Sequence, residues 1–218
     1  MRIDELFTSI QGEGMWLGTP SVFVRTAGCN LDCHWCDTPR AKTAAMAREM
    51  TVSELAAAVA RTGLEHVVIT GGEPTLYPSE LIDLCALLRS ARHVTTLETN
   101  ATAFVPCDAD LHSLSPKLHS AHLAPRAAWH DEVIARYAAA GREWQLKIVV
   151  GTRNDATQAL NRLDALNLSR SRVFLMPQAR TREKHAQIAD WLVPLCCKEG
   201  CRFGARLQTL LWNNAPGR

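Results

Sequence analysis

Three cysteines, Cys29, Cys33 and Cys36, lie within eight positions of the segment GCNLDCHWCDT, residues 28–38. Thiolates at such spacing can bind one metal centre, because clustered cysteines of a reducing compartment are more often ligands or catalysts than disulfide partners. A structural zinc ion requires four ligands, and the neighbouring His34 is poorly placed to share a tetrahedral centre with Cys33. Three thiolates suit a cuboidal iron–sulfur cluster better, since each binds one iron and the fourth iron stays open to a ligand. Zinc remains the alternative.

The composition of the chain is that of a globular protein. Its 218 residues suffice for one sizeable core, 47% of them are hydrophobic, and the net charge of +2 does not point to nucleic acid or to an anionic membrane. The stretch MRIDELFTSIQGEG has no apolar run of signal-peptide length, and no window approaches the ~18 apolar residues of a membrane span. We therefore expect a cytoplasmic protein, in which the eight cysteines are not a disulfide framework.

Two hydrophobic periods alternate along the chain. Short apolar runs predict buried strands at residues 21–28, 66–72, 94–100, 110–117, 144–150 and 173–178. Apolar residues recur at helical spacing at residues 51–62, after Pro78, and at 131–143, 156–163 and 188–195. Thr51 and Glu54 form a capping-box pattern at the start of the first of these helices. Repeated strand–helix–strand units predict parallel strands with right-handed crossovers.

About six such units are too few for a closed eight-stranded barrel. The sequence therefore predicts an α/β fold, a partial, open (β/α)6 barrel in a single domain over residues 1–218, with an open doubly wound sheet as the alternative. In both folds functional groups gather at the C-terminal ends of the strands. Polar residues and glycines do follow the predicted strands: the cysteine loop, GGEP at 71–74, ETN at 98–100, SPK at 115–117 and PQ at 177–178.

The cysteine loop and its surroundings resemble those of radical S-adenosylmethionine enzymes. The pattern C-x3-C-x2-C, with Trp35 before its third cysteine, follows a first strand, and a later strand ends in GGEP. The resemblance implies that the three cysteines bind a [4Fe-4S] cluster whose open iron chelates the amino and carboxylate groups of S-adenosylmethionine. It also implies that Gly72 lets the backbone approach the methionyl part, and that Glu73 or nearby backbone acceptors meet its ammonium.

The N-terminal part narrows the resemblance to the 7-carboxy-7-deazaguanine synthase family. That family's pattern, F-x-S-x-Q-G-E-G, G-x-P, F-V-R and G-C-N-L-x-C-x-W-C-D-T, is matched at nearly every position of residues 6–38. Downstream, TGGEPTL, LETNAT, LSPKLH, LKIVV and LLW are also similar, so the resemblance spans almost the whole chain. It implies a lyase that converts 6-carboxy-5,6,7,8-tetrahydropterin to 7-carboxy-7-deazaguanine with release of ammonia. This reaction belongs to the biosynthesis of queuosine and other 7-deazapurines, a tRNA modification pathway.

The resemblance assigns roles residue by residue. It implies an S-adenosylmethionine site formed by Trp35, Cys36, Asp37, Gly72, Glu73, Ser115, Pro116, Lys117 and Gln178. It implies substrate contacts from Ile10, Gln11, Gly12, Glu13, Arg25 and Thr70. Residues 1–20 form the N-terminal substrate-binding segment and residues 203–218 a C-terminal segment. Thr38 would offer its hydroxyl to Mg²⁺, whose octahedral shell water and substrate oxygens would complete.

The implied reaction starts when a donor such as flavodoxin or ferredoxin reduces the cluster and S-adenosylmethionine is cleaved to a 5′-deoxyadenosyl radical. The radical abstracts a hydrogen from C6 of the pterin, the ring contracts with Mg²⁺ positioning the substrate, and a second hydrogen transfer restores S-adenosylmethionine. No catalytic side chain is implied beyond the cluster and S-adenosylmethionine, since the protein supplies positioning and exclusion of solvent. The resemblance also implies a homodimer; we expect no direct contact with nucleic acid or membrane.

The residues themselves leave structural alternatives open. Arg25 lies in a buried strand, where its charge needs a partner. The partner is either a substrate carboxylate, which matches the paired N–H donors of the guanidinium, or a protein carboxylate in a structural salt bridge. Residues 11–14 are consistent with a plain loop as well as with a loop that binds the edge of a pterin, and Thr38 is consistent with a turn residue. Lys117 fits a solvated surface, and Glu98 fits a strand-end polar group as well as a site acceptor.

The remaining cysteines are expected to be structural. Cys85 and Cys107 suit buried or incidental thiols. CCKEGC at 196–201, with Cys196, Cys197 and Cys201, suits helix and turn residues better than a second cluster.

Two positions depart from the family pattern. The histidine that commonly precedes the LLW-like segment is Gln208 here, which puts a substrate or magnesium contact from this position in doubt. The glycine after E-T-N is Ala101. Two rival functions remain: a glycyl-radical activase, whose protein substrate does not call for the Q-G-E-G and F-V-R patterns, and a non-catalytic zinc-binding module.

Overall fold

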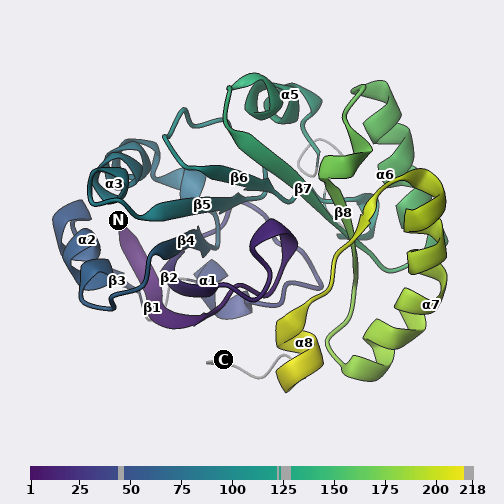
Figure 1. Cartoon of the computed structure of the whole chain (residues 1–218), viewed down its shortest axis with the longest axis horizontal. Helices are drawn as coiled ribbons and strands as arrows, with labels where there is room; N and C mark the ends of the chain where they lie inside the picture. Colours follow the sequence, from purple (N-terminus) through teal and green to yellow (C-terminus); the bar gives the residue numbers. More distant parts are fainter. Residues whose placement is uncertain (44–46, 122, 124–128, 214–218) are drawn as a thin grey trace.

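The computed structural model describes residues 1–43, 47–121, 123 and 129–213, and its centre is one curved sheet in the order β3-β1-β2-β4-β5-β6-β7-β8-β9 (Figure 1). Six consecutive strands are parallel. They are β2 (Pro20–Thr26), β4 (His66–Gly71), β5 (Val94–Thr99), β6 (Leu111–Leu114), β7 (Glu143–Val150) and β8 (Val173–Pro177). The short strands β3 (Arg48–Glu49) and β9 (Arg202–Phe203) end the sheet without closing it. Because the order of the parallel strands from β2 to β9 never reverses, the sheet is the expected open barrel and not a doubly wound sheet.

Strand β1 (Arg2–Ile10) was not anticipated as a strand. It pairs antiparallel with β2 and β3 and carries a register shift between Ile3 and Glu5. Charged residues at positions 2, 4 and 5 interrupt the alternation of apolar and polar residues that would predict a strand. The register shift also moves Asp4 out of regular pairing. The N-terminal segment is therefore a strand up to Ile10, and only the residues after it form an irregular loop with a 3₁₀ turn at Gly14–Trp16.

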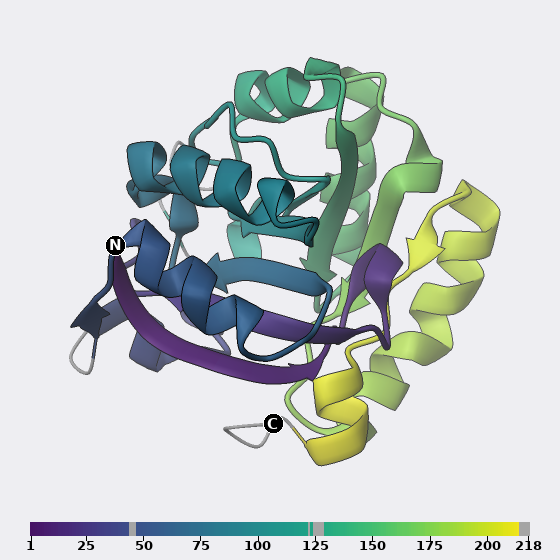
Figure 2. The same ribbon diagram turned by 60° about the vertical axis from the view of Figure 1, so that its left-hand side comes forward.

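Five helices cover the outer face of the curved sheet (Figure 2). They are α2 (Val52–Ala60), α3 (Pro78–Ser90), α5 (Asp131–Ala139), α6 (Arg153–Ala165) and α7 (Arg182–Glu199). The Thr51–Glu54 capping box predicted for α2 is present, because each of these residues bonds the other's backbone N–H. Gly200 ends α7 in the left-handed conformation that suits a glycine.

The core lies between the sheet and these helices. Side chains such as Val24, Ile69, Leu97 and Ile148 face outward and are buried against the helices. Since side chains alternate along a strand, the residues next to them face inward. The inward positions of the same strands carry Arg25, Thr70, Glu98 and Lys147. Strand alternation thus gives the barrel an apolar outside and a polar inside.

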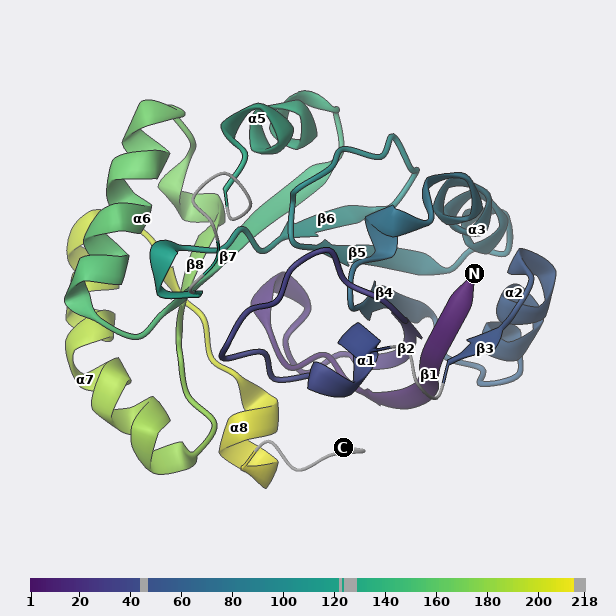
Figure 3. The ribbon, with the colours of Figure 1, turned by 180° about the vertical axis from the view of Figure 1, so that it is seen from behind.

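Two short helices, α1 (Pro39–Thr43) and α8 (Leu207–Trp212), were also not anticipated. Seen from behind, the loop that leads from β2 to α1 crosses in front of the strands (Figure 3). Residues 214–218 of the expected C-terminal segment lie outside the described residues. No helix in the described part of the chain is long and apolar enough to cross a membrane.

Candidate active site

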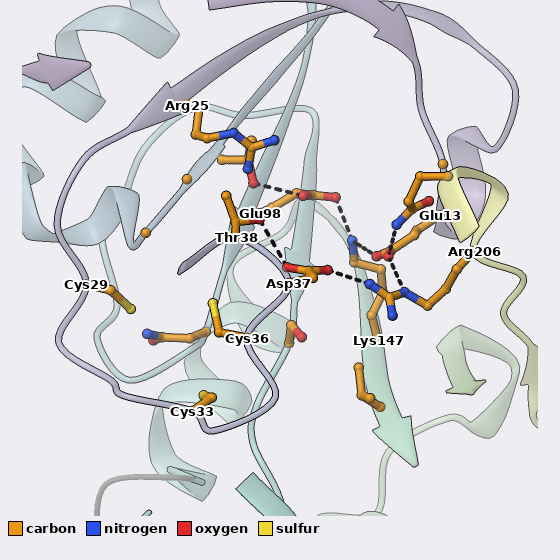
Figure 4. Close-up of a pocket in the computed structure, with 18 of the residues that line it drawn as sticks. Glu13, Arg25, Cys29, Cys33, Cys36, Asp37, Thr38, Glu98, Lys147 and Arg206 are labelled. Atoms are coloured by element: carbon orange, nitrogen blue, oxygen red, sulfur yellow. Dashed lines mark hydrogen bonds and ion pairs between the residues drawn. The ribbon is translucent and has the colours of Figure 1, made fainter. Parts of the chain in front are cut away.

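A cavity of about 880 Å³ opens inside the barrel at the C-terminal ends of the strands. It is lined by all the predicted site residues except Pro116, which is buried beside it. Those that line it are Ile10, Gln11, Gly12, Glu13, Arg25, Cys29, Cys33, Trp35, Cys36, Asp37, Thr38, Thr70, Gly72, Glu73, Ser115, Lys117 and Gln178. The cysteine loop lies at one end of the cavity, and Glu13 with its partners lies at the other (Figure 4).

The cysteine end is apolar. Cys33 is buried with Leu31 and Ala121, and Cys29 and Cys36 pack against them. Burial raises the pKa of the Cys29 and Cys33 thiols, so metal binding must displace their protons. The Leu31 N–H lies 3.4 Å from the Cys29 Sγ, a hydrogen bond of the kind that tunes iron–sulfur clusters.

The donor set at this end fits a three-thiolate cluster better than zinc. His34, the fourth ligand that zinc would need, is exposed and does not line the cavity. Among the described residues, the three thiols included, no group of three or more His, Cys, Asp or Glu side chains is already arranged as metal ligands. The three thiols share one irregular loop along one cavity, so that they can turn toward a common cluster and leave one position for a ligand.

Gly71 and Gly72 attach the end of β4 to the cysteine loop. The Gly72 N–H donates to the Thr26 carbonyl at 3.0 Å, and the Glu73 N–H donates to the Gly28 carbonyl at 2.8 Å. A Cβ on Gly72 would overlap that same Gly28 carbonyl. Gly71 has a φ of +140°, which favours glycine. The glycines are thus required for contact between two protein segments, in addition to the close approach of a ligand expected from the sequence.

Glu73 was expected to meet the ligand's ammonium, but its carboxylate is fully buried and already bonded. It accepts hydrogen bonds from the Thr75 N–H and hydroxyl at 3.0 and 2.7 Å, from the Thr99 hydroxyl at 2.6 Å and from the Asn100 N–H at 2.7 Å. These bonds join the ends of β4 and β5. They favour the other expectation from the same motif, that backbone acceptors near Glu73 meet the ammonium.

At the opposite end, Lys147 forms a buried ionic network with two carboxylates. Its Nζ donates to Glu13 Oε2 at 3.0 Å and to Glu98 Oε1 at 2.5 Å. Burial alone would lower the pKa of Lys147, but the charges of Glu98 and Glu13 outweigh it and raise this pKa. Burial likewise tends to raise the pKa of Glu13, but Lys147 and Arg206 outweigh it and hold that pKa well below its ordinary value. Both groups therefore stay charged inside the barrel.

The amide and hydroxyl groups predicted to bind substrate complete this network. Gln11 donates to Glu98 Oε1 at 3.3 Å, and its own amide oxygen accepts from the Glu13 N–H at 3.1 Å. Thr70 donates to Glu98 Oε2 at 3.0 Å. Gln208 donates to Glu13 Oε1 at 2.8 Å. The position that departs from the family pattern thus lines the cavity and contacts a predicted substrate residue.

A third wall of the cavity comes from β1 and β2. The rings of Phe7 and Phe23 stack with centroids 4.9 Å apart, and the Arg25 guanidinium lies 5.5 Å from the Phe7 centroid. Arg25 Nε also donates to Glu5 Oε2 at 3.0 Å, which is the structural salt bridge weighed as its alternative. Arg40 of α1 pairs with the other oxygen of Glu5. Arg25 therefore has a protein partner and still faces the cavity, so both interpretations of this residue stay open.

Near the cysteine loop, Lys117 and Thr38 each have protein partners. The Lys117 Nζ donates to the carbonyl and hydroxyl oxygens of Ser115 at 2.6 and 2.8 Å and lies 5.8 Å from the centre of the Trp35 ring. The Thr38 hydroxyl donates to Asp37 Oδ1 at 3.0 Å. Lys117 is therefore a cavity residue and not a solvated surface lysine.

Comparison with known proteins decides the family. The family model of the radical SAM superfamily matches residues 23–141. The 7-carboxy-7-deazaguanine synthase of Rhodopirellula baltica is 35% identical over 230 residues, which cover 100% of this chain and 88% of that protein. The chain belongs to the 7-carboxy-7-deazaguanine synthase family. The 7-carboxy-7-deazaguanine synthase of Pyrobaculum aerophilum is also 35% identical, over 100% of this chain and 97% of that protein.

The fold agrees with the sequence relatives. The crystal structure of QueE from Escherichia coli superposes with a TM-score of 0.70 at 25% identity and covers 93% of this chain and 92% of that one. Membership of the 7-carboxy-7-deazaguanine synthase family confirms the expected enzyme class and implies a [4Fe-4S] cluster and S-adenosylmethionine as cofactors. It removes the zinc-binding module as a rival and disfavours the activase.

Sequence reasoning missed the two cations that pair with Glu13, Lys147 and Arg206. Lys147 stands in WQLKIVV, where a lysine within a buried strand signals a buried ion pair, since such a charge needs a partner. Arg206 follows a two-residue strand, and no local pattern marks it. Glu98, which was weighed evenly, is a site residue in that it lines the cavity and accepts from Lys147.

The cysteines outside the loop lie in structural positions. Cys85 and Cys107 are buried in the core between α2, α3 and the sheet. Cys196 belongs to α7, Cys197 is exposed, and the Cys201 N–H donates to the Cys196 carbonyl at 3.1 Å at the helix end. These contacts match the expected helix and turn and give no support to a second cluster.

Proposed function

We propose that this chain is a 7-carboxy-7-deazaguanine synthase that converts 6-carboxy-5,6,7,8-tetrahydropterin to 7-carboxy-7-deazaguanine and ammonia. One observation carries the proposal: a single cavity joins the three-cysteine loop to a buried, charged end lined by the family's substrate motif. The reaction has no net oxidation, since the product and ammonia together contain all the atoms of the pterin. The site therefore needs a radical initiator and a positioning surface and no stoichiometric oxidant.

The cysteine end holds the cofactors. Cys29, Cys33 and Cys36 would bind the cluster, and residues of the Trp35–Asp37, Gly72 and Ser115–Lys117 segments would surround S-adenosylmethionine. When bound, the cluster and S-adenosylmethionine supply the radical that removes a hydrogen from C6 of the pterin. The apolar packing of Cys33 with Leu31 and Ala121 would exclude water from this end.

The charged end holds the pterin. The 2-amino and N3–H groups of a pterin are donors, and the carboxylates of Glu13 and Glu98 are acceptors. Lys147 pairs with both carboxylates, and Lys147 and Arg206 hold the pKa of Glu13 well below its ordinary value. Arg25 would release Glu5 in favour of the substrate carboxylate, which its guanidinium matches equally well. The stacked Phe7 and Phe23 rings offer a flat apolar wall to the pterin ring.

Further partners are inferred from the family resemblance. Thr38 would bind Mg²⁺ through its hydroxyl oxygen, whose hydrogen already points to Asp37 and leaves a lone pair available. We infer a cytoplasmic homodimer that receives electrons from a flavodoxin or ferredoxin. A magnesium titration of turnover tests the first inference, and sedimentation of the anaerobic protein tests the homodimer.

The decisive experiment is anaerobic reconstitution followed by incubation with S-adenosylmethionine, dithionite and 6-carboxy-5,6,7,8-tetrahydropterin, with the product identified by mass. We expect 7-carboxy-7-deazaguanine. An intact cluster that cleaves S-adenosylmethionine without forming this product would remove the substrate assignment and leave the superfamily assignment standing.

The cysteine roles predict a contrast between two variants. Cys33→Ala should lose the iron–sulfur absorbance and all product formation, because two thiolates remain where the cluster needs three. Cys197→Ala removes an exposed thiol outside the cavity and should keep the iron content and turnover of the parent protein. Full iron content in Cys33→Ala would contradict the proposed ligand set.

A further inference from the structure

One guanidinium, that of Arg206, contacts three segments that are far apart in the sequence. Its Nε donates to Glu13 Oε1 at 3.1 Å, its Nη1 donates to the Ala179 carbonyl at 2.9 Å, and its Nη2 pairs with Asp37 Oδ2. Figure 4 shows Arg206 between Glu13 and Asp37, with dashed contacts to each. Asp37 directly follows the third cysteine of the cluster loop, and Glu13 belongs to the predicted pterin-binding loop. Arg206 is thus a direct bridge between the two ends of the cavity.

The bridge is buried and depends on both carboxylates. Arg206 is only 6% exposed, and a buried guanidinium is stable only when it is paired. Its two acidic partners differ in their other contacts. Glu13 is also held by Lys147 and Gln208, whereas Asp37 has a side chain 41% exposed and a neighbouring donor in Thr38. The position of Asp37, and with it that of Arg206, therefore depends on the order of the cluster loop.

The start of α8 is attached to Arg206. Arg206 is the N-cap residue of this helix, and the next residue, Leu207, donates its N–H to the Gly12 carbonyl at 3.0 Å. Gln208, in the first turn, donates to Glu13. A displacement of Arg206 would therefore shift Gly12 and Glu13 through the backbone as well as through the ion pair. The first turn of α8 is therefore the element whose position depends on both ends of the cavity.

We propose that Arg206 makes binding of S-adenosylmethionine at the cluster loop and binding of the pterin at Glu13 mutually dependent. A bound cofactor fixes residues 29–38 and so fixes Asp37, Asp37 fixes Arg206, and Arg206 aims the Glu13 carboxylate at the pterin edge. By linkage the pterin then favours S-adenosylmethionine binding by the same factor. Arg206 acts as a positioning residue, and this inference rests on the proposed function.

The test measures equilibrium binding without turnover. Anaerobic calorimetry on the cluster-loaded protein, with no reductant, gives the Kd of 6-carboxy-5,6,7,8-tetrahydropterin with and without saturating S-adenosylmethionine. For the parent protein we expect S-adenosylmethionine to tighten pterin binding about tenfold, within the range of typical couplings. In Arg206→Gln the ratio of the two Kd values should fall to about one. Asp37→Asn should reduce the ratio as well, and the double variant should reduce it no further than Arg206→Gln alone.

Arg180→Gln is the matched control. The Arg180 Nη2 donates to the Cys36 carbonyl at 2.8 Å, so this arginine also holds the cluster loop, but none of the described contacts links it to Glu13. Its removal should leave the ratio of Kd values at the parent value. If Arg206→Gln fails to fold, Asp37→Asn still tests the link, because that change lies on a partly exposed side chain.

The outcomes separate this inference from the proposed function. If the parent protein does not bind the pterin at all, the proposed function fails. If it binds the pterin with the same Kd with and without S-adenosylmethionine, the coupling is wrong and the proposed function stands. If Arg206→Gln or, in its place, Asp37→Asn keeps the parent ratio, Arg206 is not the link.

Discussion

Glu13 keeps its charge inside the barrel because each of its oxygens has a charged donor. Oε2 accepts from Lys147, and Oε1 accepts from Arg206 and Gln208. Hydrogen bonds to an ionised group are about twice as strong as neutral ones. Without the Glu13 carboxylate each buried cation would lose one of its two acidic partners, and Lys147 would keep Glu98 and Arg206 would keep Asp37. The same carboxylate that is proposed to bind the pterin thus also stabilises the fold.

This arrangement predicts an acid-dependent contribution to stability. The folded-state pKa of Glu13 lies below its ordinary value of 4.5, so below pH 4.5 the unfolded chain binds a proton that the folded chain does not. The contribution is present above that pH and is lost as the pH falls toward the folded-state pKa. Glu13→Gln should therefore flatten the fall in unfolding free energy below pH 4.5 by up to about 1.4 kcal/mol per pH unit.

Urea unfolding of the cluster-free protein between pH 3.5 and 7, followed by tryptophan fluorescence, measures this slope. Glu132→Gln, on the exposed side of α5, is the matched control and should keep the parent slope. An unchanged slope in Glu13→Gln would mean that Glu13 is not held ionised by its cations.

At the scale of elements, the close contact between β4 and the cysteine loop is the most demanding feature of the site. Gly72→Ala should place a Cβ against the Gly28 carbonyl and push the loop away from the strand end. We expect a loss of about 3 kcal/mol of unfolding free energy, the cost of overpacking. Since the displaced loop carries the cysteines, the iron content after reconstitution should fall as well.

Gly63→Ala separates crowding from backbone strain. Gly63 has a φ of +68°, so alanine there is strained, but no atom lies within 4 Å of the added Cβ. This variant should lose only about 1–2 kcal/mol and keep the parent iron content. Gly72→Ala with parent iron content would show that the contact does not position the loop.

The same elements show what the sequence could predict. The six parallel strands and the helices between them have clear periods of two and 3.6 residues, and the capping box at Thr51 marks a helix start, so all of these were predictable. Strand β1 was not, because Glu5 lines the cavity and both Asp4 and Glu5 pair with Arg40, and these surroundings exist only in the folded chain. Arg206 lies 193 residues from Glu13, and no local pattern encodes a contact of that range.

At the scale of the molecule, the open side of the barrel is completed by two short helices that would be only marginally stable in isolation. Helices α1 and α8 have five and six residues, and isolated helices shorter than ~12 residues are marginal in water. Helix α8 is attached to the start of α7 by the Arg182 N–H to Asn213 Oδ1 bond at 3.0 Å and by Arg182 Nη2 to the Leu211 carbonyl at 2.6 Å. Its first turn is attached to residues 12 and 13 by the Leu207 N–H to Gly12 carbonyl bond and by Gln208 to Glu13, and Arg206 links it to Asp37 of the cysteine loop.

Binding of the cluster and S-adenosylmethionine should therefore order the cysteine loop and helix α8 together. Hydrogen exchange of the cluster-free protein and of the protein loaded with cluster and S-adenosylmethionine measures the effect peptide by peptide. We expect slower exchange at residues 28–43, which the cofactors contact, and also at residues 205–213, which are linked to the cysteine loop through Asp37 and Arg206. Helix α3 is packed in the core and should exchange at the same rate in both states. Protection confined to residues 28–43 would show that the cysteine loop closes independently of α8.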